Sequence, residues 1–138
     1  MDRTKLVELL NEDLQTEYQS IVQYIQHSAT IKGPEYMSTA EELRAHLGQE
    51  LEHALMLAEQ VDFLEGTPTV EVPPINSVTD SRRALELDLE LETRQLERYR
   101  ERVEQTIEMG LPDVAEALRP LLQQTQDHVR DLQSALGL

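Results

Sequence analysis

The sequence predicts an all-α fold, a four-helix bundle made of two antiparallel helix hairpins that a long crossover joins. Three observations predict it. Apolar residues recur at alternating spacings of three and four through four long segments. Two short breaks and one long proline-rich connection separate these segments. The second half of the chain also repeats the first at an offset of 75 residues, which takes Glu17 to Glu92 and His53 to His128.

The composition agrees with long helices and excludes several classes of protein. The 138 residues suffice for one domain, residues 1–138, with its own core, and 4% aromatic with 28% charged residues is typical of helices. The absence of cysteine excludes thiolate metal sites and disulfides. No long apolar run is present, so we expect a cytoplasmic protein without a membrane span or signal peptide. The net charge of −15 disfavours nucleic acid as a partner.

The first two predicted helices form one hairpin. The first, about residues 3–31, ends at the helix-breaking run Lys32-Gly33-Pro34. The second, about residues 35–64, ends before Gly66. Each carries one apolar stripe that includes ionisable residues; the stripes comprise Leu10, Leu14, Glu17, Ile21 and Tyr24 in the first helix, and Leu43, Leu47, Glu50, Ala54 and Leu57 in the second.

The third and fourth predicted helices form the second hairpin. The third spans about residues 80–109, and Ser77 with Asp80 is typical of a capping box before it. Gly110 separates it from the fourth, about residues 112–136. Pro120 inside the fourth helix removes one backbone hydrogen bond, so we expect a kink there.

The crossover, about residues 65–79, fixes the topology. Pro68, Pro73 and Pro74 make it extended rather than helical. About 14 extended residues reach about 45 Å, which is also about the length of a 30-residue helix. The crossover can therefore run the length of the bundle, which makes the second and third helices parallel.

Three glutamates at mid-helix positions of the apolar stripes carry the chemistry. Glu17, Glu50 and Glu92 are expected at one level of the bundle, together with His53 and His128. A buried carboxylate without a partner costs several kcal/mol, and no Lys or Arg occupies the stripes at that level. Carboxylate and imidazole together suit Fe, Mn or Zn. A metal site is the favoured interpretation, and a hydrogen-bonded polar core is the alternative.

The segments LLNEDLQTEYQSIVQYIQH, ELEHALMLAEQVDFLEGTP and DLELETRQLERYRERVE resemble bacterioferritin and, more widely, ferritin-like di-iron proteins. The resemblance covers about residues 6–136 and implies a homo-oligomer, at least a dimer. It implies oxidation of Fe(II) by O₂ or peroxide at a di-iron or single-iron centre, in iron storage or detoxification. It assigns Glu17 and His53 to one metal, Glu92 and His128 to the other, and Glu50 to the bridge between them. Glu50 and Tyr24 are the expected catalytic residues.

Three departures from the family pattern qualify this expectation. The second bridging carboxylate falls at Thr125, whose hydroxyl is a poor ligand. The haem-ligating methionine of bacterioferritins falls at Leu51, so no haem is expected. The chain lacks a short fifth helix after the fourth, which argues against a conventional storage shell. The competing hypothesis is therefore a helical oligomerisation or interaction module whose metal site has decayed.

Two further histidines lie outside the expected ligand set. His46 is seven residues before His53 on the same helix face, where it either forms an ordinary hydrogen bond or binds iron in transit. His27, near the end of the first helix, is expected only to complement the helix dipole.

Overall fold

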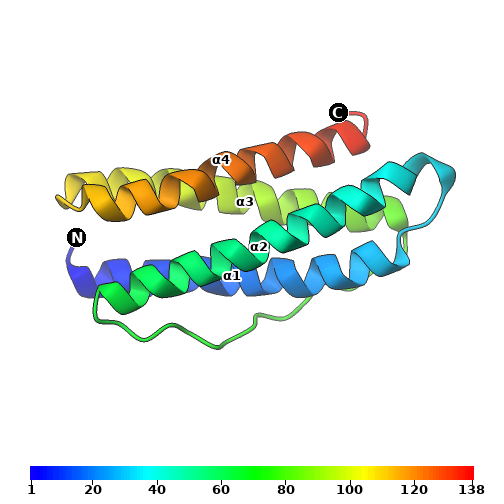
Figure 1. Ribbon diagram of the computed structural model, residues 1–138. Helices are drawn as coiled ribbons and strands as arrows, with labels where there is room; N and C mark the ends of the chain where they lie inside the picture. Colours follow the sequence, from blue (N-terminus) through cyan, green and yellow to red (C-terminus); the bar gives the residue numbers. More distant parts are fainter.

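The computed structural model describes all 138 residues and contains four long helices and no strand, which confirms the all-α prediction (Figure 1). A single 3₁₀ turn, η1, precedes the second helix. None of the helices is long and apolar enough to cross a membrane. The helices are α1 (Arg3–Thr30), α2 (Met37–Phe63), α3 (Ser81–Glu108) and α4 (Pro112–Ala135), and η1 covers Pro34–Tyr36.

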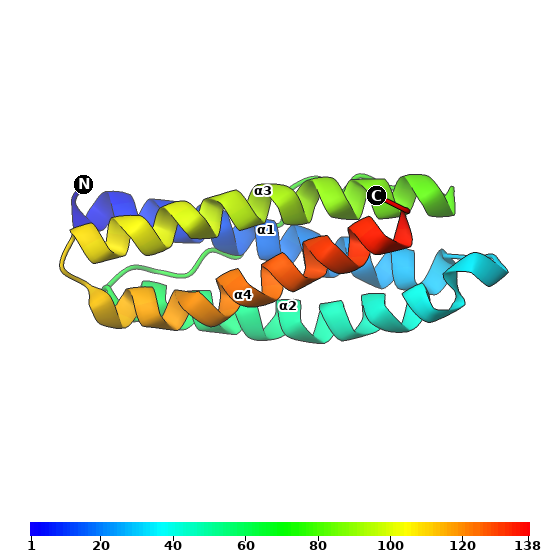
Figure 2. The ribbon, with the colours of Figure 1, turned by 90° about the horizontal axis from the view of Figure 1, so that it is seen from above.

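The helices form two antiparallel hairpins, α1 with α2 and α3 with α4, packed face to face (Figures 1 and 2). The segment between α2 and α3 returns along the whole bundle, so α2 and α3 run in the same direction, as the single long crossover predicts (Figure 1). Pro120 lies inside α4, which stays helical across it.

Side chains of α1 hold the crossover in place. The hydroxyl of Tyr18 donates to the backbone oxygen of Thr69 at 2.9 Å, and the side-chain amide of Asn11 donates to the oxygen of Thr67 at 3.1 Å. Further along, the amide of Gln26 donates to the Ser77 hydroxyl at 2.8 Å. The crossover is therefore tied to one helix over several turns.

The predicted capping box at the start of α3 is wrong. Asp80 is itself the N-cap, and its carboxylate accepts a hydrogen bond from the backbone N–H of Arg83 at 2.8 Å. Ser77 instead accepts from Gln26, because the crossover is still held against α1 at that point.

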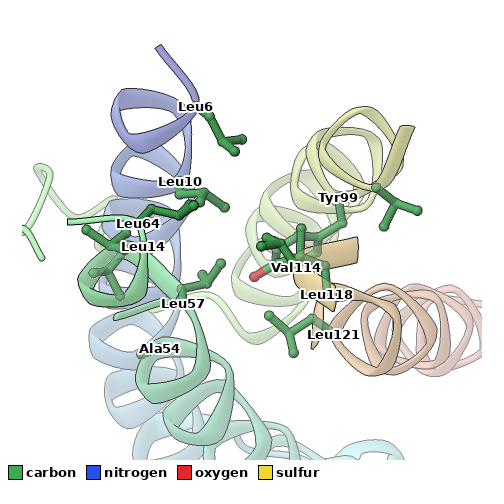
Figure 3. Packing of buried hydrophobic residues seen from close by; sticks show 12 residues of the cluster. Leu6, Leu10, Leu14, Ala54, Leu57, Leu64, Tyr99, Val114, Leu118 and Leu121 are labelled. Atoms are coloured by element: carbon green, nitrogen blue, oxygen red, sulfur yellow. The ribbon is translucent and has the colours of Figure 1, made fainter. Parts of the chain in front are cut away.

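Apolar side chains form two clusters, one towards each end of the bundle. The larger cluster gathers leucines such as Leu10 and Leu57 with Tyr99 between the two hairpins (Figure 3). The smaller one contains Tyr24 and Leu132. Burying one such leucine contributes about 1.5–3 kcal/mol. The two clusters therefore offset the cost of burying the polar layer that lies between them.

Buried contacts between ionisable side chains join α1 to α3 on both sides of that layer. Arg102, 1% exposed, donates to both carboxylate oxygens of Asp13, at 2.8 and 3.2 Å. His27 is fully buried, and its Nδ1 lies 2.8 Å from Asp88 Oδ1. The repeat offset relates the two pairs, since it takes Asp13 to Asp88 and His27 to Arg102. His27 therefore makes a buried tertiary contact, which the expected dipole role did not include.

Candidate metal centre

The layer between the apolar clusters holds five metal-ligating side chains from all four helices. Glu17 lies on α1, Glu50 and His53 on α2, Glu92 on α3 and His128 on α4, and each is at most 1% exposed. They form two groups whose candidate ligand atoms lie within 4.8 Å of one another. Both groups include Glu50; they are Glu17 with Glu50 and His53, and Glu50 with Glu92 and His128.

The Nδ1 atoms of both histidines face these carboxylates. Nδ1 of His53 lies 3.5 Å from Glu50 Oε2 and 3.7 Å from Glu17 Oε1. Nδ1 of His128 lies 3.0 Å from Glu50 Oε1 and 3.4 Å from Glu92 Oε2. Glu50 therefore presents one oxygen to each half of the centre.

Two glutamines orient the histidine rings from outside. Nε2 of His53 is 2.7 Å from the side-chain oxygen of Gln124, and Nε2 of His128 is in hydrogen-bond contact with that of Gln49. Such a partner fixes the tautomer that leaves Nδ1 free to face a metal. The sequence prediction missed both glutamines, although the offset of 75 residues also relates Gln49 to Gln124.

Two buried tyrosines hold the terminal glutamates. The Tyr24 hydroxyl donates to Glu92 Oε1 at 2.9 Å, across the bundle from its own helix, and the Tyr99 hydroxyl donates to Glu17 Oε1. Gln95 also donates to Glu17 Oε1, at 2.9 Å. Burial, together with the negative charge of the nearby glutamates, raises the pKa of both tyrosines well above its ordinary value. Both phenols therefore stay protonated and serve as hydrogen-bond donors.

The pKa values of the three glutamates are shifted in different directions. Burial and the charges of Glu17 and Glu92 raise the pKa of Glu50 well above its ordinary value. Burial alone would raise the pKa of Glu17, but the adjacent Glu50 carboxyl and His53 ring outweigh it and lower that pKa to about 2. Burial opposes ionisation of Glu92 too, yet Glu50 and His128 lower its pKa. Without a cation, Glu50 is therefore the last of the three to lose its proton as the pH rises.

The electrostatics of the layer fit a bound cation. Histidines are the only basic side chains that contact the three glutamates, because the inward-turned Arg102 pairs with Asp13. Burial lowers the pKa of His53, but Glu17 outweighs this effect, so the pKa is raised. Glu17 Oε2 and His53 Nδ1 are buried without a hydrogen-bond partner. Orphaned polar atoms beside crowded carboxylates are the donor set that a divalent metal satisfies.

Thr125 occupies the position that the repeat offset relates to Glu50. Thr125 is fully buried, and its hydroxyl donates to the backbone oxygen of Leu121 at 2.7 Å. Thr125 has no carboxylate to match Glu50, and this hydrogen bond directs its hydroxyl at the backbone of its own helix. Leu51, at the haem-methionine position, points outward and is 54% exposed.

His46 lies beside the centre. It is 3% exposed, its ring stacks on that of His128 with a centroid separation of 4.0 Å, and Nε2 is 3.1 Å from Asp131 Oδ2. Burial and the neighbouring His128 lower the pKa of His46. It contacts the predicted ligand set without being in either of the two groups.

Comparisons with known proteins agree with this architecture. A bacterioferritin from Rhodobacter capsulatus is 28% identical over 135 residues, which are 97% of this chain and 84% of the relative. Its solved structure, described as having a metal-free dinuclear site and a haem iron, superposes with a TM-score of 0.87 over 99% of this chain and 86% of that one. A ferritin-like di-iron-carboxylate protein from Bacillus anthracis is 30% identical, with a TM-score of 0.92 over 99% of both chains.

The family description "Ferritin-like domain" matches residues 7–138, nearly the whole chain. Two half-sites of carboxylate and imidazole inside a four-helix bundle are also the arrangement of di-metal carboxylate bundles. This chain belongs to the ferritin-like family.

Proposed function

We propose that this protein binds Fe(II) inside the bundle and oxidises it with O₂ or peroxide, as part of iron storage or detoxification. One observation carries the proposal: two buried groups of ligand atoms share Glu50. The bacterioferritin and di-iron-carboxylate relatives support iron over other metals. Mn and Zn suit the same donors.

Each ligand has a distinct role in this proposal. Glu17 and His53 bind one ion, Glu92 and His128 bind the other, and Glu50 bridges the two. Iron bound there supplies the electrons for reduction of the oxidant. The chain's own contribution is to fix the ligands through Gln49, Gln124 and the two tyrosines, and to exclude bulk water. Tyr24, in contact with Glu92, is the proposed redox-active side chain.

The missing second bridge makes the centre asymmetric. Three carboxylates against two divalent ions leave one net positive charge, which a hydroxide neutralises. We therefore propose that the second ion binds more weakly than the first, so that single-ion occupancy occurs at low iron concentration.

The test is the rise in near-ultraviolet absorbance when Fe(II) is added to the metal-free protein in air. The wild type is expected to oxidise Fe(II) faster than buffer does, and Glu50→Gln is expected to oxidise at the buffer rate. Glu52→Gln, an exposed change on the same helix, serves as the control. A wild type that oxidises no faster than Glu50→Gln removes the proposal.

We also propose that the protein is a homo-oligomer, at least a dimer. Leu51 and Leu55 lie one turn apart on the outer face of α2 and are 54% and 63% exposed. A contiguous apolar patch on a protein surface is typical of an interaction site, and these two leucines are candidates for part of one. Light scattering of the purified protein tests this, and a monomer at micromolar concentration contradicts it.

A module with a decayed metal site is the second candidate, and Thr125 is the observation that favours it. Thermal unfolding with and without Fe(II) or Mn(II) separates the two candidates. A functional centre raises the melting temperature, and the rise grows with the logarithm of metal concentration above the Kd, whereas a decayed centre gives the same temperature in both conditions.

A further inference from the structure

The crossover lies along the outer side of the first hairpin. Figure 1 shows it following α1 on the side that faces away from α3 and α4. Three side chains of α1 donate to its backbone oxygens at 2.9 to 3.3 Å, and a fourth donates to the carboxylate of Glu71; they are Asn11, Tyr18 and Gln19, and then Gln15. The oxygen of Asn11 also accepts from the backbone N–H of Thr69 at 2.9 Å. Polar side chains of a single helix thus hold an extended polypeptide mainly by its main chain.

The second hairpin has a related surface that no segment of the chain covers. A cavity of about 590 Å³ lies on the outer side of α3, next to the end of α4. The repeat offset of 75 residues takes the four crossover-binding residues of α1 to four residues that line this cavity; they are Glu86, Glu90, Thr93 and Arg94. It also takes the buried Leu14 and Val61 to Leu89 and Leu136, which line the cavity as well. This cavity, the α3 groove, is therefore the open counterpart of the surface that holds the crossover.

The α3 groove retains groups that can bind an extended main chain. The carboxylate of Glu86 can accept from a backbone N–H, as the related Asn11 does. Thr93 and Arg94 carry hydrogen-bond donors, as do the two residues of α1 at the related positions. Leu89 gives the groove an apolar surface for a side chain of the bound segment. Main-chain hydrogen bonds with one apolar contact are a recurring way to bind an extended peptide.

The charges of the α3 groove differ from those that face the crossover. The four crossover-binding residues of α1 are neutral, whereas three of their four counterparts are charged. Arg83 pairs with the two groove glutamates nearest to it, at 3.5 and 3.7 Å, and Glu97 pairs with Arg100. The exposed Arg94 has neither an ion pair nor a hydrogen bond within the chain, although the net charge is −15. An unpaired guanidinium group beside an apolar surface favours a carboxylate on the bound segment.

We propose that the α3 groove binds an extended, acidic polypeptide segment of a partner protein, in the way that α1 binds the crossover. The main chain of the segment bonds to Glu86 and Thr93, an acidic side chain pairs with Arg94, and an apolar side chain covers Leu89. The crossover is covalently attached, so neutral side chains suffice to hold it, whereas a separate partner is selected by charge. None of the five metal-centre residues lines the groove, so the inference does not depend on the proposed oxidation.

The probe is a synthetic peptide with the sequence of residues 66–79, GTPTVEVPPINSVT, with blocked termini and a fluorescent label. This segment fits the related surface on α1, and Glu71 is its only charged residue. The fluorescence anisotropy of the peptide is measured as the whole protein is added. Saturable binding of one peptide per chain is expected. Arg94→Glu is expected to bind about ten-fold more weakly. The matched control is Arg119→Glu, an exposed change on α4 outside the groove, and it is expected to bind like wild type.

A charge exchange tests the assigned contact. A second peptide, in which Glu71 is replaced by Lys, is expected to bind Arg94→Glu more tightly than it binds wild type. Absence of saturable binding below about 1 mM protein overturns the inference. Equal binding by Arg94→Glu and Arg119→Glu, with either peptide, overturns it too, because the peptide then binds elsewhere.

A filled groove distinguishes a partner protein from a second copy of this chain. Thr93→Trp places a large side chain in the groove at an exposed position. It is expected to abolish peptide binding and to leave the mass measured by light scattering equal to that of Arg119→Glu. A lower mass for Thr93→Trp would show that a second copy occupies the groove, which overturns the assignment to a partner.

Discussion

Tyr99 on α3 donates a hydrogen bond to Glu17 on α1, and Tyr24 on α1 donates one to Glu92 on α3. The two contacts are equivalent under the repeat offset of 75 residues. Each hairpin therefore supplies the phenol that holds the other hairpin's terminal glutamate. The sequence places both tyrosines on core stripes, where packing alone explains them. Their crossed donation shows that they also stabilise the two carboxylates whose pKa values are lowered.

Replacing either phenol by phenylalanine is expected to weaken the metal-free protein. Tyr99→Phe leaves Glu17 with one side-chain donor fewer in a dry interior, and a hydrogen bond to a charged group contributes about 2 kcal/mol. Tyr24→Phe is expected to have a similar effect through Glu92. Urea unfolding of the metal-free protein measures both. The control is Tyr18→Phe, whose hydroxyl contacts only the half-buried crossover, and an equal loss in all three variants contradicts the account.

Glu50→Gln is expected to stabilise the metal-free protein while abolishing metal binding at the buried centre. The pKa of Glu50 is raised above its unfolded value of 4.5. Its contribution to stability is therefore fully present below about pH 4.5 and is lost as pH rises towards the folded pKa. The variant does not titrate, so its advantage over wild type is expected to grow as pH rises above 4.5. Thermal melts from pH 4 to pH 8 measure this, and a variant that is less stable at pH 7 contradicts it.

Thr125→Glu is expected to tighten binding of the second ion by on the order of ten-fold, because it adds a charged oxygen ligand opposite Glu50. It is also expected to destabilise the metal-free protein, since a fourth carboxylate enters the buried layer. Calorimetric titration with Mn(II) measures the affinities. Unchanged stoichiometry and affinity would show that position 125 does not face the ions.

Gln124→Ala is expected to weaken metal binding about 10- to 100-fold, because His53 loses the contact that fixes its ring. Gln123→Ala is the matched control, since Gln123 is exposed and bonds only to neighbours on α4. The same Mn(II) titration applies to both variants. Equal affinities for the two would mean that the ring of His53 is positioned by packing alone.

The helices and the level of the centre were predictable because they depend on spacing. An alternating stripe fixes which face of a helix is buried, and the two short breaks fix which helices are antiparallel neighbours. Glu17, Glu50 and Glu92 therefore meet at one level whatever rotamers their side chains adopt. The repeat offset then relates His53 to His128 without any knowledge of tertiary contacts.

The contacts around the centre were not predictable in the same way. Tyr24 lies on the helix of Glu17 but bonds to Glu92, and this choice depends on distances across the bundle. Arg102 turns inward to Asp13, one turn from the stripe residue Tyr99, where a charged residue on a Glu-rich helix reads as solvent-facing. The cavity that His46 and Asp131 line depends on how α2 and α4 pack together, which a stripe pattern does not specify.

The central claim is that two divalent ions share one glutamate between the hairpins. Anomalous X-ray diffraction from a crystal soaked anaerobically in Fe(II), collected at the iron edge, tests it most directly. Two iron peaks per chain are expected, one at Glu17 and His53 and the other at Glu92 and His128, with Glu50 between them. Iron found only on surface carboxylates, with the buried layer unchanged, would contradict the claim.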